Sequence, residues 1–330
     1  MDHMQSTRNK LIELLYTHPN DYMSGQKLAD TLNISRNAIW KHMKELEKDG
    51  YEIEALPRKG YRILRTPKTM SENTLKWGLQ TNWLGKTIVH KESVDSTQQI
   101  AHELAREGAP HGTVVIANEQ TSGRGRMNRT FYSQSDQGIW MSLLIRPHIL
   151  PYLAPQLTLL TATVLAEAID EMFDIQTHIK WPNDVLINEQ KISGILTEMH
   201  AEQDQIQYVV IGIGINVFQN EEDFHPDIKK KATSIHLHTD QTIEKHHLVQ
   251  TILQTFEKQY ESFVNSGFPE VKEKWEKYGF KIGEMISIKT MRKSWNALFL
   301  GISEDGALIT QVPGEQPERI YSAEIEWFTS

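Results

Sequence analysis

Cysteine is absent from the 330-residue sequence, and its absence excludes disulfides, zinc sites with thiolate ligands and cysteine nucleophiles together. The sequence also lacks any run of about 18 apolar residues, the length that a transmembrane helix requires. The first five residues have none of the apolar character of a secretory signal. These absences predict a cytoplasmic protein that does not associate with a membrane.

The composition that remains is that of an ordinary folded protein, with 39% hydrophobic and 24% charged residues. A chain of this length is sufficient for two or three domains. The net charge of −8 is unevenly distributed, because residues 1–66 contain 11 Lys and Arg against 9 Asp and Glu, whereas the remainder contains 24 against 34. The small positive excess predicts that any polyanionic partner binds the N-terminal segment.

Residues 1–66 have the pattern of a winged helix-turn-helix domain. Apolar residues at helical spacing predict three short helices, over 7–17, 25–32 and 36–47, and Ser24 and Ser35 are suitable N-caps for the second and third. A basic hairpin follows, with its turn at 56–60. Three compact helices and a basic hairpin favour binding to DNA.

The third predicted helix has an apolar face formed by Ile39, Met43 and Leu46 and a polar face opposite to it. In a winged helix-turn-helix domain this helix enters the major groove, and the hairpin contacts phosphates. The residues expected to contact DNA are Ser35, Arg36, Asn37, Trp40, Lys41, Lys44, Arg58, Lys59 and Arg62. Two alternatives stay open: the polar face is merely solvated, or Trp40 packs inside the domain.

A glycine- and arginine-rich loop over 119–129, with the sequence EQTSGRGRMNR, follows a buried strand predicted over 113–117. Glycine lets the backbone approach a ligand closely. Guanidinium groups fit phosphate and carboxylate oxygens. The loop is therefore suited to wrap around an anion, although a basic surface loop is the alternative for this motif alone.

Four further motifs lie in the central region. Ser96-Thr97 begins a predicted helix, where free backbone N–H groups suit an anionic ligand, although ordinary capping is the alternative. The strings 180–184 (KWPND) and 212–216 (GIGIN) adjoin strands, and Lys191 enters the second strand of a hairpin. For Asn183-Asp184, turn formation is the alternative role.

Helices and strands alternate irregularly from residue 71 onward. Helices are predicted over 71–84, 155–173, 243–264 and 268–278. From 281 to the end, short strands separated by hairpin turns predict a small SH3-like barrel.

The ordered set of motifs resembles that of the biotin protein ligases, and with the winged helix it resembles the bifunctional kind that also acts as the biotin operon repressor. The motifs that carry the resemblance are Ser96-Thr97, Gln120 with Gly123–Arg126, Lys180–Asp184, Lys191-x-x-Gly194 and Gly212–Asn216. The resemblance covers nearly the whole chain. It implies an α+β fold with a DNA-binding domain over 1–66, a ligase domain over 67–280 and an SH3-like domain over 281–330. The ligase domain would be a mixed sheet flanked by helices, related to class II aminoacyl-tRNA synthetases and lipoate ligases.

The activity that the resemblance implies is ATP-dependent. Biotin would be activated as biotinyl-5′-AMP and transferred to one lysine of the biotin carboxyl carrier protein of acetyl-CoA carboxylase. The same adenylate would be the corepressor of a homodimer on operator DNA, since helix-turn-helix proteins usually read two-fold sites. No Asp, Glu and His cluster suggests a preformed metal site, so Mg²⁺ would arrive with the nucleotide.

Adenylation joins a carboxylate to a triphosphate, and preorganised cations must offset the repulsion. Arg124, Arg126 and Lys191 are therefore the expected catalytic residues. Those expected to bind biotin are Ser96, Thr97, Gln98, Gln120, Arg124, Gly125, Arg126 and Lys191, with Trp140 and Ile213 as candidate apolar walls. Those expected to bind ATP or the adenylate are Arg129, Phe131, Lys180, Asn183, Asp184 and Asn216.

The loop departs from the family at Met127-Asn128, and Phe131 stands where many members have tryptophan. Two other functions remain open. One is a repressor that senses biotin without catalysis, against which the retained Arg124, Arg126 and Lys191 argue. The other is a ligase of the same fold for lipoate or octanoate, against which the 180–184 string argues.

Overall fold

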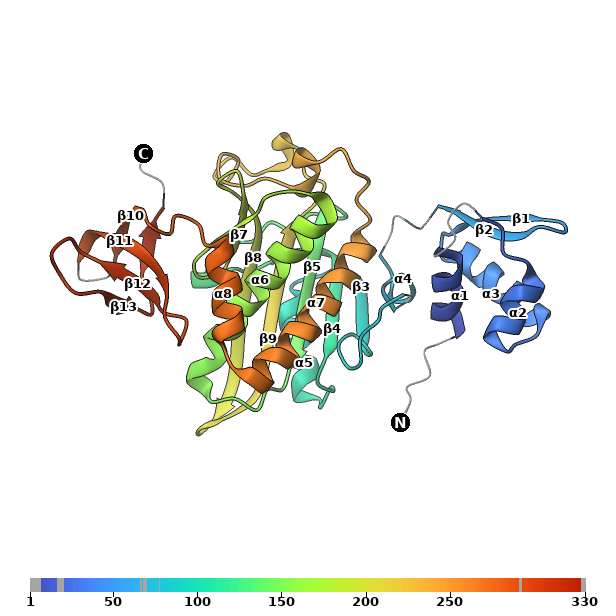
Figure 1. Ribbon diagram of the computed structural model, residues 1–330, viewed down its shortest axis with the longest axis horizontal. Coiled ribbons are helices and arrows are strands. Elements are labelled where there is room, and N and C mark those ends of the chain that lie inside the picture. Colours follow the sequence, from blue (N-terminus) through green and yellow to red (C-terminus); the bar gives the residue numbers. More distant parts are fainter. Residues whose placement is uncertain are drawn as a thin grey trace.

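The computed structural model describes residues 7–16, 21–65, 67, 70–76, 78–290 and 293–327. A central body of sheet and helices lies between a small helical unit, formed by the N-terminal part of the chain, and a small sheet, formed by the C-terminal part (Figure 1). The predicted class, α+β with a helix-turn-helix unit and a mixed central sheet, is confirmed.

The N-terminal unit has its own apolar core. Its elements are α1 (Thr7–Tyr16), α2 (Gly25–Leu32), α3 (Arg36–Lys48), β1 (Glu52–Leu56) and β2 (Gly60–Arg65). Ser24 and Ser35 cap α2 and α3 as predicted, since each hydroxyl accepts a backbone N–H at 3.1 Å. The apolar face of α3 lies in this core, which is separate from the core of the central body.

The central sheet has seven strands in the order β3-β4-β5-β9-β8-β7-β6. The strands are β3 (Ile88–Val94), β4 (Thr113–Gln120), β5 (Gly138–Ile145), β6 (His178–Lys180), β7 (Asp184–Ile187), β8 (Gln190–Glu202) and β9 (Gln205–Asn216). Only β3 and β4 are parallel, and the other neighbours are antiparallel. The order brings β4, β5, β9 and β8 side by side, although about 50 residues separate β5 from β8 in the chain.

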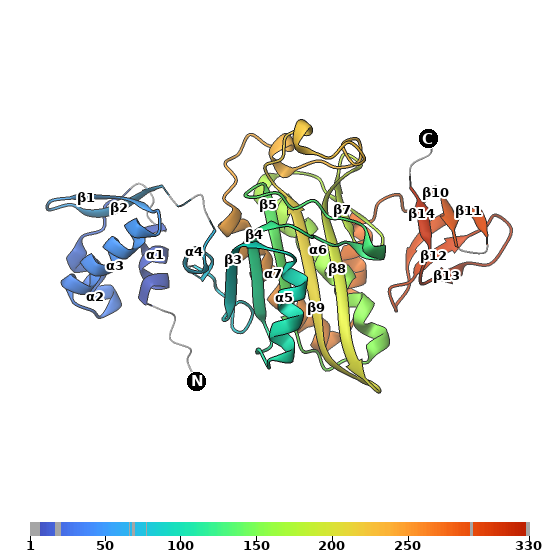
Figure 2. The same ribbon diagram turned by 180° about the vertical axis from the view of Figure 1, so that it is seen from behind.

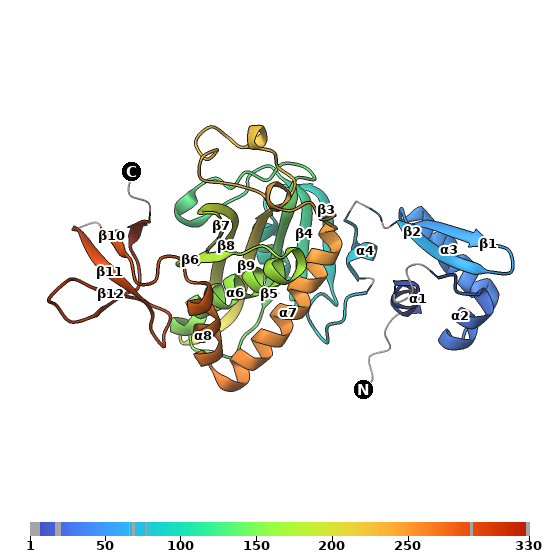
Figure 3. The ribbon, with the colours of Figure 1, turned by 45° about the horizontal axis from the view of Figure 1, so that its top comes forward.

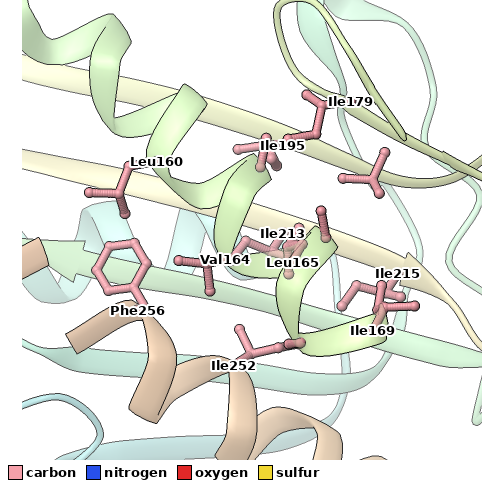
Figure 4. Close-up of a cluster of buried hydrophobic side chains, with 14 of the residues drawn as sticks. Leu160, Val164, Leu165, Ile169, Ile179, Ile195, Ile213, Ile215, Ile252 and Phe256 are labelled. Atoms are coloured by element: carbon pink, nitrogen blue, oxygen red, sulfur yellow. The ribbon is translucent and has the colours of Figure 1, made fainter. Parts of the chain in front are cut away.

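The two faces of the sheet are covered differently. Helices α6 (Ala154–Phe173), α7 (Lys245–Ser266) and α8 (Pro269–Tyr278) cover the face seen in Figure 1, whereas α5 (Thr97–Arg106) lies on the other face (Figure 2). Side chains alternate along each strand. Ile195 and Ile213 therefore point into the main core against Leu165 of α6 (Figure 4). Their neighbours along the strand face α5.

Helix α6 belongs to a segment, 151–173, that is long and apolar enough to cross a membrane by length and composition alone. Its most apolar window is 72% buried inside the structure. Such burial is typical of the central helix of a folded core, and here it packs between the sheet and α7 (Figure 4).

The prediction of a helix over 71–84 is wrong in its second half. Helix α4 spans only Glu72–Lys76, and Gly78 has a φ of +82°. The carboxylate of Glu257 on α7 accepts the backbone N–H groups of residues 82, 83 and 84 at 2.5 to 2.9 Å. These N–H groups would otherwise donate within a helix, so a contact distant in the sequence overrides the local pattern.

The C-terminal strands form a five-stranded antiparallel sheet in the order β13-β12-β11-β10-β14. They are β10 (Met285–Lys289), β11 (Ser294–Ile302), β12 (Leu308–Gln311), β13 (Glu318–Ile320) and β14 (Glu324–Glu326), the last of which was not predicted. The apolar core of this sheet continues into the central body, because the Phe299 ring lies 6.4 Å from Trp275 of α8 and 5.5 Å from Trp327.

Candidate functional site

The predicted biotin-binding residues meet in one pocket on the α5 face of the sheet. The pocket is narrow, about 50 Å³, and lies where the N-terminus of α5 meets the end of β4, the first half of β8 and the end of β9. Its lining residues are Ser96, Thr97, Gln98, Gln120, Arg124, Gly125, Arg126, Phe131, Met141, Ser142, Asn183, Lys191, Gly194, Ile195, Leu196, Gly212, Ile213 and Gly214. All eight residues expected to bind biotin are among them.

Three glycines form the floor of this pocket. Gly194 of β8 pairs with Gly214 of β9, and Gly212 lies two residues before it. A Cβ atom at Gly214 would lie 2.5 Å from the Phe131 ring, and one at Gly194 would lie 2.7 Å from Lys191 Nζ. At Gly212 and Gly214, the close approach of Gln98 and Phe131 from other segments favours glycine, which explains the Gly-x-Gly spacing in β9.

The N-terminus of α5 is capped from β4 and not by its own first residues. The Gln120 Oε1 atom accepts the Thr97 backbone N–H at 2.9 Å and its hydroxyl at 3.1 Å, while Ser96 makes no capping hydrogen bond. Ordinary capping by Ser96 is thus excluded as its role. Ser96 and Thr97 are left to line the pocket beside Ser142, whose Oγ atom lies 2.9 Å from Thr97 Oγ1.

Gln98 lines the pocket with its side-chain oxygen. Its amide nitrogen points away, donating to the backbone carbonyls of Leu196 at 3.3 Å and Val210 at 3.2 Å, and to the Glu198 carboxylate at 3.0 Å. The oxygen accepts a hydrogen bond from the Ser142 hydroxyl at 3.2 Å. The orientation of the amide is therefore fixed by its surroundings.

The arginine-rich loop folds back as a narrow hairpin. The Gly125 N–H donates to the Arg129 carbonyl at 2.8 Å, and the Phe131 N–H donates to Gly123 at 2.9 Å. Arg124 and Arg126 are exposed at the mouth of the pocket, and Arg126 donates to Asn183 Oδ1 at 3.3 Å. The two cationic groups of the loop thus line the same pocket as the glycine floor.

Phe131 returns the chain from this loop into the pocket. Its ring lies edge-to-face against Trp140 at 5.8 Å and 5.5 Å from Lys191 Nζ. The next residue, Tyr132, stacks on His225 with 4.8 Å between ring centroids and 9° between planes. This stack joins the arginine loop to the segment after β9, which lies over the same end of the sheet (Figure 3).

The Asp184 carboxylate lies between two lysines. Its Oδ1 atom is 2.7 Å from Lys191 Nζ and its Oδ2 atom is 3.3 Å from Lys180 Nζ. Burial by itself would raise the pKa of the Asp184 carboxyl, but the Lys191 and Lys180 ammonium groups hold that pKa below its ordinary value. Of the three groups, only Lys191 lines the pocket.

Asn183 forms the turn that the sequence offered as its alternative role, and it also contacts the arginine loop. Its amide nitrogen donates to the Ile195 carbonyl at 2.8 Å, and its backbone closes a turn onto Lys180. Its side-chain oxygen accepts the hydrogen bond from Arg126. The turn therefore presents this oxygen to the pocket.

Several predicted residues are not brought to the pocket lining: Arg129, Trp140, Lys180, Asp184 and Asn216. Asn216 is buried, where it donates to the Thr233 carbonyl at 3.0 Å and accepts from Gln219 at 3.2 Å, so that it anchors the segment after β9. Trp140 lies behind Phe131. Ile213, the other candidate apolar wall, is among the lining residues, and its side chain packs in the main core on the α6 side of the sheet (Figure 4). Its role as a wall of the pocket stays a prediction.

Sequence reasoning missed Ser142, which lies inside the pocket and is fully buried. It also missed Leu196 and the role of Gly212 as floor. Ser142 is the only polar side chain in the apolar strand 138–145. A lone hydroxyl in such a strand was a usable signal, since buried polar groups need partners.

The predicted DNA-contacting residues lie on one helix and its hairpin. Ser35, Arg36, Asn37, Trp40, Lys41, Lys44, Arg58 and Lys59 are exposed. Trp40 is 54% exposed, which excludes the alternative that it packs inside the domain. Arg62 differs, because its guanidinium donates to Glu54 at 2.7 Å and lies 4.8 Å from the Tyr22 ring centre. Its charge is already paired within the wing.

Comparisons with known proteins agree with this arrangement. Residues 91–216 match the biotin/lipoate A/B protein ligase family model, and residues 7–62 match an HTH domain model. The chain is 46% identical to the bifunctional ligase/repressor BirA of Bacillus subtilis (strain 168), with 98% of this chain and 99% of that protein covered. It is 26% identical to BirA of Escherichia coli (strain K12), over 92% of each chain. A solved biotin protein ligase from Aquifex aeolicus, in complex with biotin and ATP, is 30% identical with a TM-score of 0.64, covering 73% of this chain and 98% of that one.

Proposed function

The chain belongs to the family of bifunctional biotin ligase/repressors, and on this basis we propose that it activates biotin with ATP and transfers it to a carrier protein. The activated form is biotinyl-5′-AMP. The acceptor is one lysine of the biotin carboxyl carrier protein of acetyl-CoA carboxylase. The same protein, loaded with biotinyl-5′-AMP, represses genes of biotin synthesis and transport.

One observation carries the proposal. Residues from four separate segments, 96–98, 120–126, 191–196 and 212–214, line a single pocket that combines uncharged hydrogen-bonding groups with two arginines and a lysine. A ligand with a polar ring and an acidic tail fits this combination of groups. Ser96, Thr97 and Gln120 would bind the ureido ring, beside Gln98 and Ser142.

The cations would act on the first step. A carboxylate oxygen of biotin attacks the α-phosphorus of ATP, and diphosphate leaves as the mixed anhydride forms. Both reactants are anionic, so Arg124, Arg126 and Lys191 would hold them together and offset their repulsion. Gly125 allows the loop backbone to close over the adenylate.

The nucleotide would lie toward Phe131, whose ring would stack on adenine. Arg129, Asn183 and Asn216 would orient the nucleotide or the loops around it, and Asp184 with Lys180 would act beside Lys191. Within the described residues, no group of three or more His, Asp or Glu is placed to hold a metal ion. Mg²⁺ would thus enter with the triphosphate, whose charge it would help to neutralise.

In the second step the neutral amine of the carrier lysine attacks the acyl carbon of the anhydride. An amide bond forms and AMP leaves. The reaction needs an acceptor that reaches the mouth of the pocket, where the arginine loop is exposed.

The repressor function would use the N-terminal unit. Helix α3 would enter the major groove, with Arg58 and Lys59 on flanking phosphates. A homodimer formed with bound biotinyl-5′-AMP would match a two-fold operator in the cytoplasm. The proposal also includes the domain boundaries, with a DNA-binding domain over 1–66, a ligase domain over 67–280 and an SH3-like barrel over 281–330. The ligase domain would be related to class II aminoacyl-tRNA synthetases.

The decisive experiment incubates the protein with ATP, an apo carrier domain and either biotin or lipoate, and then measures the carrier mass. A gain of one biotinyl group, lost when the acceptor lysine is replaced by arginine, is the expected result. A gain with lipoate alone would indicate the related ligase. Tight binding of biotin with no gain in carrier mass would indicate a sensor without catalysis.

A further inference from the structure

The two lysines at Asp184 differ in what they can reach. Lys191 and Lys180 each pair with a different oxygen of the carboxylate, at 2.7 and 3.3 Å. The side chain of Asp184 is only 14% exposed, whereas those of Lys191 and Lys180 are 32% and 24% exposed. Lys191 borders the pocket, and Lys180 lies outside its lining.

The backbone around this group is held firmly. Lys180 and Asp184 are opposite each other in the β6–β7 pair. The Lys191 N–H donates to the Lys231 carbonyl at 2.8 Å, and the Lys191 carbonyl accepts from Thr233 at 3.0 Å. Any motion of the Lys191 ammonium must therefore come from its side chain alone.

The proposed reaction requires such a motion, because Lys191 cannot neutralise a substrate anion fully while it is paired with Asp184. Leaving Asp184 would strand a nearly buried carboxylate, which is strongly unfavourable when no other partner remains. Lys180 pairs with the second oxygen, so the carboxylate would keep one partner if Lys191 moved away.

We propose that Lys180 is a positioning residue, which keeps the Asp184 charge paired so that Lys191 can exchange Asp184 for the anionic oxygens of the substrates. The inference rests on the proposed ligase function, and it assigns to Lys180 a role through Lys191 and not a contact with ATP. The remaining cation facing this group is Arg126, which is hydrogen-bonded to the neighbouring Asn183.

The test compares single-turnover rates of biotinyl-AMP formation in Lys180→Met, Asp184→Asn and the double variant. Lys180→Met should be slower than wild type by roughly 100-fold, because Lys191 becomes the main partner of a buried charge. The double variant should form biotinyl-AMP at least about tenfold faster than Lys180→Met alone, because residue 184 then carries no charge that needs a partner. A residue with a merely structural role would give a double variant as slow as, or slower than, the single one.

Two controls define the chemistry. Lys180→Arg keeps the charge and should stay within about threefold of wild type. Lys274→Met removes a lysine of similar exposure that pairs with Glu167 at 3.1 Å on the opposite face of the sheet, and it should leave the rate unchanged. Thermal melting of every variant verifies that the fold is retained.

A pH series gives a second readout that does not depend on Asp184→Asn being active. Without Lys180 the pKa of Asp184 rises, so protonation at lower pH removes the stranded charge. The deficit of Lys180→Met relative to wild type should therefore shrink as the pH falls from about 8 to about 5.5. A deficit that is constant with pH, together with no rescue in the double variant, would overturn the inference. Failure of wild type itself to form biotinyl-AMP would instead overturn the proposed function.

Discussion

The ammonium group of Lys191 is the cation nearest to the glycine floor, where an anionic oxygen of biotin or ATP would lie. Lys191→Ala is expected to slow biotinyl-AMP formation by roughly 100-fold or more, since it removes a charge from the reacting groups. The side chain is partly exposed, so the melting temperature should change little. Single-turnover kinetics and thermal melting measure the two effects. A wild-type rate in this variant would refute the assigned role.

Arg126 is exposed on the loop and reaches across to Asn183 at 3.3 Å. Arg126→Gly should release biotinyl-AMP about tenfold faster, because a charge-assisted contact that closes the loop over the adenylate is lost. Stopped-flow fluorescence with excess unlabelled biotin as a chase measures the release. Arg58→Gly, in the wing, is the matched control. Equal release rates of biotinyl-AMP from the two variants would contradict the role assigned to Arg126.

At this scale the sequence brought out the residues expected to bind biotin, all of which line the pocket, whereas the charged residues Arg129, Lys180 and Asp184 lie outside that lining. Arginines, lysines and a glutamine within glycine-rich motifs have few other roles, so Arg124, Gln120 and Lys191 could be predicted directly. Ser142 and the glycine floor depend on the register between β5, β9 and β8, which motif spacing does not reveal.

Among the elements, the wing makes a specific distinction between its arginines. Arg58 is exposed at the hairpin turn, whereas Arg62 is paired with Glu54 and packed on Tyr22. Arg58→Met should weaken operator binding a few-fold and lower the slope of log affinity against log salt by about one. Arg62→Met should mainly lower the melting temperature. Fluorescence anisotropy at several salt concentrations separates the two.

The opposite pattern, with Arg62→Met changing the salt slope and Arg58→Met changing only stability, would contradict this division.

The helices and strands were largely predictable from the sequence, because hydrophobic periodicity and capping residues are local. Residues 78–84, which were predicted to be helical and are not, are the exception. Its chain path is set by a carboxylate about 175 residues later in the sequence, and no local pattern carries that information.

On the scale of the whole molecule, the N-terminal unit has a core separate from that of the central body. Deletion of residues 1–66 is therefore expected to abolish operator binding and to leave biotin transfer measurable. Gel-shift assays and carrier mass measurement test the two activities in parallel. Equal loss of both would show that the units depend on each other.

The order of the motifs along the chain predicted the family, but their meeting in space follows from the sheet. Residues 120–126, 191–196 and 212–214 become neighbours because β9 and β8 follow β5 in the sheet. A seven-stranded mixed sheet allows many strand orders, and local sequence does not choose among them. The family resemblance supplied that choice.

The most direct test of the central claim is a crystal structure of the protein grown with biotin. We predict that the ring lies against Ser96, Thr97 and Gln120, with the carboxylate facing the cationic side formed by Arg124, Arg126 and Lys191. Biotin bound away from residues 120–126, or an arginine loop that makes no contact with it, would contradict the account.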